Sequence, residues 1–242
     1  MSTKRMWATV RRILAQLLHD PRTIALMLLA PCLLMTILKY IYFNNPNVFQ
    51  QVAGSLLGIF PMLIMFLVTS VATLRERTSG TLERVLILPL TKFEFIIGHA
   101  VAFGIAAFIQ ALVVSTFAIA LLSLRVAGSQ LMLIVVVILN ALLGLAIGLF
   151  VSSFAKTEFQ AVQFLPMVLF PQLLVSGLLA PRETMPELLQ AISTFLPLTY
   201  AVDATKIVIS GQGSLNRVLF IIALFLTALL LAGALSLKRK SK

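Results

Sequence analysis

The chain is poor in the residues that disulfides, ion coupling and catalysis require. Cys32 is the only cysteine among 242 residues, so no disulfide can form within the chain. Only eight residues are acidic, and all lie outside the middles of the long hydrophobic runs, so no carboxylate is placed to carry a proton or hold sodium inside a membrane. The motifs Gly-x-x-x-x-Gly-Lys-Ser/Thr, Gly-x-Ser-x-Gly and His-Glu-x-x-His are also absent. The sequence therefore predicts no ATPase or other enzymatic activity, no metal site and no cofactor in this chain.

Hydrophobic sequence is what the chain has in abundance: 60% of its residues are apolar and 11% are charged. A helix needs about 20 apolar residues to cross roughly 30 Å of hydrocarbon. Six runs are that long: residues 24–43, 52–74, 95–124, 131–154, 162–180 and 218–237. The third exceeds one crossing, so we expect its first turns to lie in the interface or the helix to tilt. Continuous apolar runs exclude a barrel and predict an all-α integral membrane protein, a single domain over residues 1–242 with six transmembrane helices.

Basic residues flank these runs unequally. Segments holding most of them alternate along the chain with segments holding few, and the poorer segments contain Arg125, Arg182, Lys206 and Arg217. Because basic residues are retained in the cytoplasm, both termini are predicted to be cytoplasmic. The net charge of +11 is spread over membrane-flanking segments and forms no aromatic-interleaved patch. It favours contact with membrane lipids, and nucleic-acid binding is not expected.

Residues 4–20 precede the first run and have the pattern of an amphipathic helix lying in the membrane interface. At 100° per residue the apolar side chains fall in one arc, and basic residues such as Arg11 and Arg12 fall on the rest. The apolar set is Met6, Trp7, Val10, Ile13, Leu14, Leu17 and Leu18. Arg11 and Arg12 also interrupt any signal-peptide core, which favours an uncleaved anchor. Two interpretations remain open: a passive anchor, or a lever that passes cytoplasmic motion to the first span.

Neutral polar residues occur within the runs. Gln110, Asn140 and Gln172 are candidates for the substrate pathway, with interhelical hydrogen bonding as the alternative. Gly144 and Gly148 form a Gly-x-x-x-Gly pair, which predicts a close helix contact in the fourth run.

The segment between the fifth and sixth runs, residues 181–217, is too hydrophobic for a solvated loop. Helical spacing between Pro186 and Pro197, and a second run from Tyr200 to Ile209, predict two short helices that re-enter the outer leaflet. We expect this region to gate the outer end, with Phe195, Pro197 and Tyr200 as the candidate gate residues.

The polar segment at residues 75–92 lies between the second and third runs and is the candidate docking loop. Gly80 permits a turn, and Pro89 ends a short helix. Leu82, Val85 and Leu86 supply apolar anchors at helical spacing, while Glu83 and Arg84 supply charges for register.

Residues 74–98 resemble the first cytoplasmic loop of ABC type-2 exporter permeases. Ser176–Gly177, Pro181, Met185–Pro186 and residues 196–206 resemble that family's segment between its fifth and sixth spans, and Lys206 departs from the arginine that many members carry. The resemblance implies a coupling helix that rests on an ATP-binding-cassette subunit. The positions that match the coupling motif are Glu76, Gly80, Thr81, Leu82, Glu83 and Pro89.

The resemblance further implies a bacterial inner-membrane complex. Its expected partners are two copies of the ATPase subunit, which would bind ATP and Mg, and a second copy of this chain or a similar permease. Family membership does not fix the cargo. Because the middles of the hydrophobic runs contain no charge, we expect an amphipathic or hydrophobic compound of the drug or antibiotic type, and a lipid-linked polysaccharide or lipid is the alternative. An ATP-independent channel or scaffold is the rival from another class.

Overall fold

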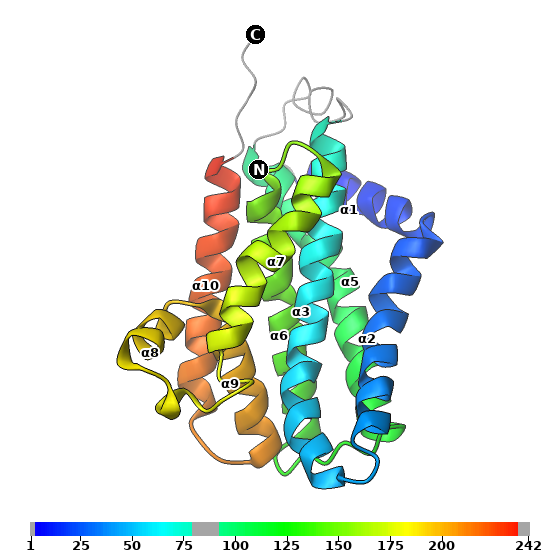
Figure 1. Ribbon diagram of the computed structural model, residues 1–242. Coiled ribbons are helices and arrows are strands. Elements are labelled where there is room, and N and C mark those ends of the chain that lie inside the picture. Colours follow the sequence, from blue (N-terminus) through cyan, green and yellow to red (C-terminus); the bar gives the residue numbers. More distant parts are fainter. Residues whose placement is uncertain (1–2, 79–91, 237–242) are drawn as a thin grey trace.

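The computed structural model describes residues 3–78 and 92–236, and all regular structure in these ranges is helical (Figure 1). The α-helices are α1 (Thr3–Leu18), α2 (Pro21–Ile41), α3 (Pro46–Thr78), α5 (Lys92–Ala120), α6 (Gln130–Ser152), α7 (Glu158–Val175), α8 (Glu187–Thr194), α9 (Pro197–Ser210) and α10 (Leu215–Ser236), with a 3₁₀ turn, η1 (Arg182–Thr184).

Six of these helices are long and apolar enough to cross a membrane, as the sequence predicts: α2, α3, α5, α6, α7 and α10. The helix bounds differ from the expected runs by a few residues, as in α3 and α5. Helix α3 has 33 residues and continues beyond the apolar run as far as Thr78. Helix α5 ends at Ala120, and the chain then turns through Ser123, whose φ is 57°. Leu122 and Leu124 of this turn are buried in the core. The third hydrophobic run is therefore long partly because it includes a non-helical segment that packs on the core.

Helices α3 and α6 form the centre of the bundle and approach each other closely at two glycines. A Cβ at Gly144 would lie 2.0 Å from the carbonyl oxygen of Met62. A Cβ at Gly148 would lie 2.1 Å from Thr69 Oγ1, and that hydroxyl donates a hydrogen bond to the Met65 carbonyl at 2.6 Å. The Gly-x-x-x-Gly pair therefore marks a close helix contact, as predicted.

The two short helices expected between the fifth and sixth runs are present as α8 and α9, which meet at a bend of 89°. Proline begins α9, and Gly211, with φ 69°, ends it in the left-handed conformation. Helix α9 lies deeper in the bundle than a simple cap, because the face that carries Leu198, Ala201 and Val202 packs with α3 and α6. Whether either helix enters a leaflet remains a prediction.

The ends of the helices divide between two ends of the bundle. Helix α1, the last turns of α3 and α10, and the first turns of α5 and α7 lie at the upper end in Figure 1. The α2–α3 turn and the α5–α6 loop lie at the other end, where Gln50 Nε2 donates to the Ser123 carbonyl at 3.1 Å. We call the upper end the α1 end. The predicted topology makes it cytoplasmic.

Thiol labelling tests this orientation. On a Cys32→Ala background, single cysteines at Thr78 and Gln130, which are both exposed and lie at opposite ends of the chain's spans, should react differently in intact cells. An impermeant reagent should label only position 130, and permeabilised cells should show labelling at 78 as the control. Labelling of position 78 from outside would reverse the topology.

Candidate functional site

A buried ion cluster joins three helices at the α1 end. Glu76, near the end of α3, contacts Arg12 of α1 through Oε1 and His99 of α5 through Oε2. The side chains of Glu76 and His99 are 8% and 1% exposed, whereas that of Arg12 is 31% exposed. Because a carboxylate is costly to bury alone, these contacts stabilise Glu76 only while α1, α3 and α5 keep their arrangement.

Helix α1 is amphipathic as expected, and one stripe of it packs on the bundle. Thr9, Val10 and Ile13 are buried against α5 and neighbouring helices. The contact is close, because a Cβ at Gly98 of α5 would lie 2.9 Å from Thr9 Cγ2. Trp7 and Leu18, also on the predicted apolar face, are 58% and 72% exposed. The helix is thus fastened to the spans, and its exposed apolar side chains are free for contact with lipid.

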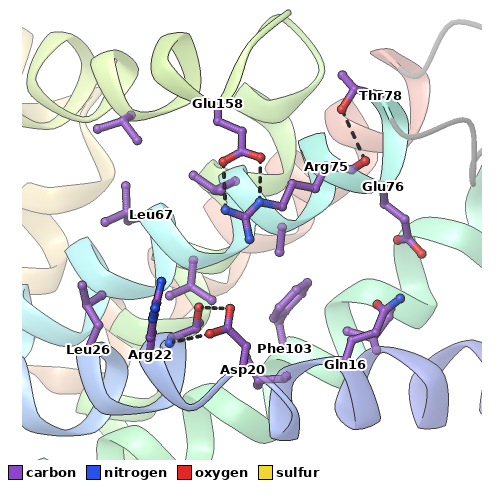
Figure 2. A pocket seen from close by; sticks show the side chains of 17 residues that line it. Gln16, Asp20, Arg22, Leu26, Leu67, Arg75, Glu76, Thr78, Phe103 and Glu158 are labelled. Atoms are coloured by element: carbon purple, nitrogen blue, oxygen red, sulfur yellow. Dashed lines mark hydrogen bonds and ion pairs between the residues drawn. The ribbon is translucent and has the colours of Figure 1, made fainter.

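Next to this cluster, a groove of about 940 Å³ opens between α1, α2, α3 and α7 (Figure 2). We call it the α1 groove. Its apolar lining comprises Ile13, Leu17, Leu26, Leu67, Val68, Val71, Ala72, Phe103 and Val162. Its polar lining comprises Gln16, Asp20, Arg22, Thr23, Arg75, Glu76, Thr78 and Glu158. Charged groups of both signs therefore line one cavity with a largely apolar floor.

The charges of the α1 groove face one another across it. Arg75 donates two hydrogen bonds to Glu158, from Nε to Oε1 at 2.7 Å and from Nη2 to Oε2 at 2.9 Å. Asp20 lies on the opposite side of the Arg75 guanidinium from Glu158 (Figure 2). Arg22, on the first turn of α2, is exposed and makes no ion pair within the described ranges 3–78 and 92–236.

Asp20 has a structural role in addition to its charge. It caps α2, accepting hydrogen bonds from the Thr23 hydroxyl at 2.7 Å and the Thr23 amide at 3.2 Å. The hydroxyl first, and then the amide, hold the pKa of Asp20 below its ordinary value. Its carboxylate is therefore charged at neutral pH and available at the groove.

Comparison with known proteins identifies the family. The family model for ABC-2 type transporters matches residues 4–210, which is most of the chain. The chain belongs to the ABC-2 type transporter family. Among its relatives, the probable multidrug ABC transporter permease YbhR of Escherichia coli K12 is 32% identical over 176 residues, covering 72% of this chain and 48% of the relative.

Two further relatives are similar in sequence to this ABC-2 type chain. The inner membrane transport permease YhhJ of Escherichia coli K12 is 30% identical over 70% of this chain and 46% of its own length. ABC transporter G family member 20 of Dictyostelium discoideum is 25% identical over 83% of this chain and 28% of its own. The chain spans about half the length of the two Escherichia coli relatives.

The three pathway candidates of this ABC-2 type chain are buried at separate places. Gln110 Nε2 donates to the Met27 carbonyl at 3.0 Å, and Asn140 Nδ2 donates to the Ala201 carbonyl at 3.1 Å. Gln172 Nε2 donates to its own helix, and its Oε1 accepts from the Leu198 amide at 3.4 Å. Each side chain thus makes a hydrogen bond to a neighbouring helix, which favours the alternative interpretation. Their contribution to a pathway stays a prediction.

The gate candidates lie where α8 meets α9. Phe195 is 79% exposed, Pro197 is the first residue of α9, and Tyr200 donates its hydroxyl to the Thr194 carbonyl at 2.7 Å. The Tyr200 ring also lies 5.8 Å from that of Phe225 on α10. The gate role of these three residues remains a prediction.

Of the predicted docking residues, Glu76 alone falls in the described ranges. Its carboxylate faces Arg12 and His99 inside the bundle and not an outer surface. The others, Gly80, Thr81, Leu82, Glu83, Arg84 and Pro89, lie outside the described residues.

Sequence reasoning missed several polar contacts of this chain. It placed Arg12 on the polar face of its helix and Glu76 in the docking motif, without joining either to the other or to His99. It also missed the pair between Arg182 and Asp203, 2.7 Å apart, which ties η1 to α9. The sequence shows only that acidic and basic residues occur in different segments. Many other pairings of these residues were equally compatible with it.

Proposed function

We propose that this chain is the membrane-spanning subunit of an ATP-driven exporter that moves amphipathic or hydrophobic compounds out across the bacterial inner membrane. It would act with two copies of a separate ATPase subunit, which bind ATP and Mg, and with a second permease. Membership of the ABC-2 type family supports the permease role. The names of the relatives YbhR and YhhJ support transport across an inner membrane and, for YbhR, the transport of multiple drugs.

The observation that carries the proposal is the buried Arg12–Glu76–His99 cluster. Residues 79–91, which hold the predicted coupling helix, connect α3 to α5 directly after Glu76 and before His99. A force applied to this segment by an ATPase subunit would act on the ends of both helices. Because Glu76 also holds Arg12, the same force would move α1 with them. This connection favours the lever interpretation of α1 over the passive anchor.

Glu76 is accordingly a positioning residue in this proposal. Its carboxylate contacts Arg12 of α1 and His99 of α5. We therefore assign contact with the ATPase to the other predicted residues, which are Gly80, Thr81, Leu82, Glu83, Arg84 and Pro89. Drug-type cargo agrees with the buried polar side chains of the span middles, which are neutral in the described ranges. A small hydrophilic ion would find no compensating charge among them. A lipid-linked polysaccharide or a lipid remains the alternative cargo.

Charge reversal at the predicted docking surface tests the proposal. Glu83→Lys should leave the chain folded and reduce the amount of ATPase subunit that copurifies with it roughly tenfold, a change of about 1.4 kcal/mol. Export should fall in parallel. Glu183→Lys makes the same charge change at the opposite end of the bundle, on an exposed residue, and should alter neither quantity. Equal ATPase retention by both variants would remove the docking role from residues 79–91.

A further inference from the structure

We propose that the α1 groove binds one phospholipid whose headgroup carries both a phosphate and a primary ammonium group. The phosphate would lie at Arg22, the ammonium at Asp20, and the acyl chains along the apolar floor. This site is independent of the exported cargo.

The groove changes from charged to apolar in one direction on three helices. On α3, Leu67, Val71 and Arg75 follow one another at intervals of four residues, so that one face passes from apolar to cationic over about 12 Å of helix axis. Arg22 and Leu26 of α2 are one turn apart, as are Glu158 and Val162 of α7. All three helices have their charged end at the α1 end (Figure 1). A lipid with its headgroup at that end changes from charged to apolar in the same direction.

Charge complementarity selects the headgroup. Arg22 has no ion-pair partner in the described parts of the chain and can bind a phosphate oxygen. Asp20 also has no ion-pair partner in those parts, and its carboxylate can accept from an ammonium, whereas Glu158 is already paired with the Arg75 guanidinium. A purely anionic headgroup would meet Asp20, and a purely cationic one would meet Arg22. A choline group lacks the N–H donors that the Asp20 carboxylate can use.

The dimensions also fit a lipid better than a protein segment. About 940 Å³ is at the upper end of the volumes of ligand pockets and accommodates a headgroup with the first part of its chains. Leu26 and Val162, on opposite walls of the groove, are 43% and 44% exposed, so the apolar part is open at its side. Acyl chains can leave through this opening into surrounding lipid, whereas a polar segment would leave its backbone unsatisfied there.

Native mass spectrometry of the purified full chain tests the proposal. Phosphatidylethanolamine, phosphatidylcholine and phosphatidylglycerol with identical acyl chains would be added in equal amounts. One bound phosphatidylethanolamine should exceed each other lipid at least roughly fivefold, a difference of about 1 kcal/mol. It should also raise the unfolding temperature. Arg22→Gln and Asp20→Asn should each remove the preference.

The variants have matched controls. Asparagine retains an acceptor for the cap of α2, so Asp20→Asn isolates the charge. Arg217→Gln removes an exposed cation from the first turn of α10, at the other end of the bundle, and should preserve the preference. Val162→Trp, which fills the groove without touching a charge, should lower binding of all three lipids.

Three outcomes would overturn the proposal. Equal retention of the three lipids, unchanged in Arg22→Gln, would indicate unspecific lipid contact. A preference for phosphatidylglycerol would contradict the role of the Asp20 carboxylate. If Val162→Trp instead separated a dimer while leaving phosphatidylethanolamine binding intact, the groove would be an interface between copies of the chain.

Discussion

Replacing Gly144 by alanine should destabilise the protein by at least about 3 kcal/mol, the upper part of the range for overpacking a core. The added Cβ would lie 2.0 Å from the Met62 carbonyl oxygen, and the next nearest atoms also belong to the backbone of α3. No rotamer change can relieve such a clash, so α3 and α6 would have to separate along the contact that forms the centre of the bundle.

The measurement is thermal unfolding of the purified chain in one detergent. Gly104→Ala is the matched control, because a Cβ there meets only Leu142 Cδ2, at 3.6 Å. Alanine in a helix is favoured over glycine by about 0.5–1 kcal/mol, so this control should be neutral or slightly stabilising. Equal unfolding temperatures for the two variants would show that the close α3–α6 contact does not exist.

Replacing Glu76 by alanine should abolish export and cost about 3–5 kcal/mol, as expected when one member of a buried ion pair is removed. The substitution leaves Arg12 and His99 without the carboxylate that joins them, in a site where His99 is 1% exposed. Helix α1 would lose its ion pair with α3. Glu76→Gln, which retains hydrogen bonding but not the charge, should fold and transport with reduced efficiency.

The matched control is Glu158→Ala, which breaks the pair with Arg75 at the same end of the bundle. The side chains of Arg75 and Glu158 are 57% and 49% exposed, and solvent screening limits such pairs to about 0–1 kcal/mol. Stability is read from thermal unfolding and export from energised efflux. If Glu158→Ala were as damaging as Glu76→Ala, or if Glu76→Gln exported normally, the buried cluster would have no coupling role.

The membrane makes much of this fold predictable from the sequence. Because every spanning segment must satisfy its backbone internally, the apolar runs indicate six helices directly, and the structure confirms all six. Pro186 and Pro197 likewise predict the break between two short helices, since proline begins a helix readily and cannot continue one. The glycine pair at Gly144 and Gly148 predicted a close contact, though not the partner helix.

Side-chain partners were less predictable. Arg12, Glu76 and His99 are far apart in the sequence, and periodicity shows only which face of a helix each occupies. Gln110 and Asn140 are buried polar residues whose sequence positions fit a ligand contact and a helix–helix hydrogen bond equally well; the structure shows the hydrogen bonds. The α1 groove depends on the angle at which α1 meets α2, which no local pattern specifies.

The most direct test of the central claim is transport by inside-out vesicles that contain the chain together with its copurified ATPase subunit. A panel of fluorescent lipophilic cations and neutral amphiphiles would be supplied with ATP, without ATP, and with the Glu83→Lys and Glu183→Lys variants. The account predicts accumulation that requires ATP, is lost in Glu83→Lys and persists in Glu183→Lys. Solute flux through the chain alone, without ATP or an ATPase subunit, would contradict it and indicate a channel.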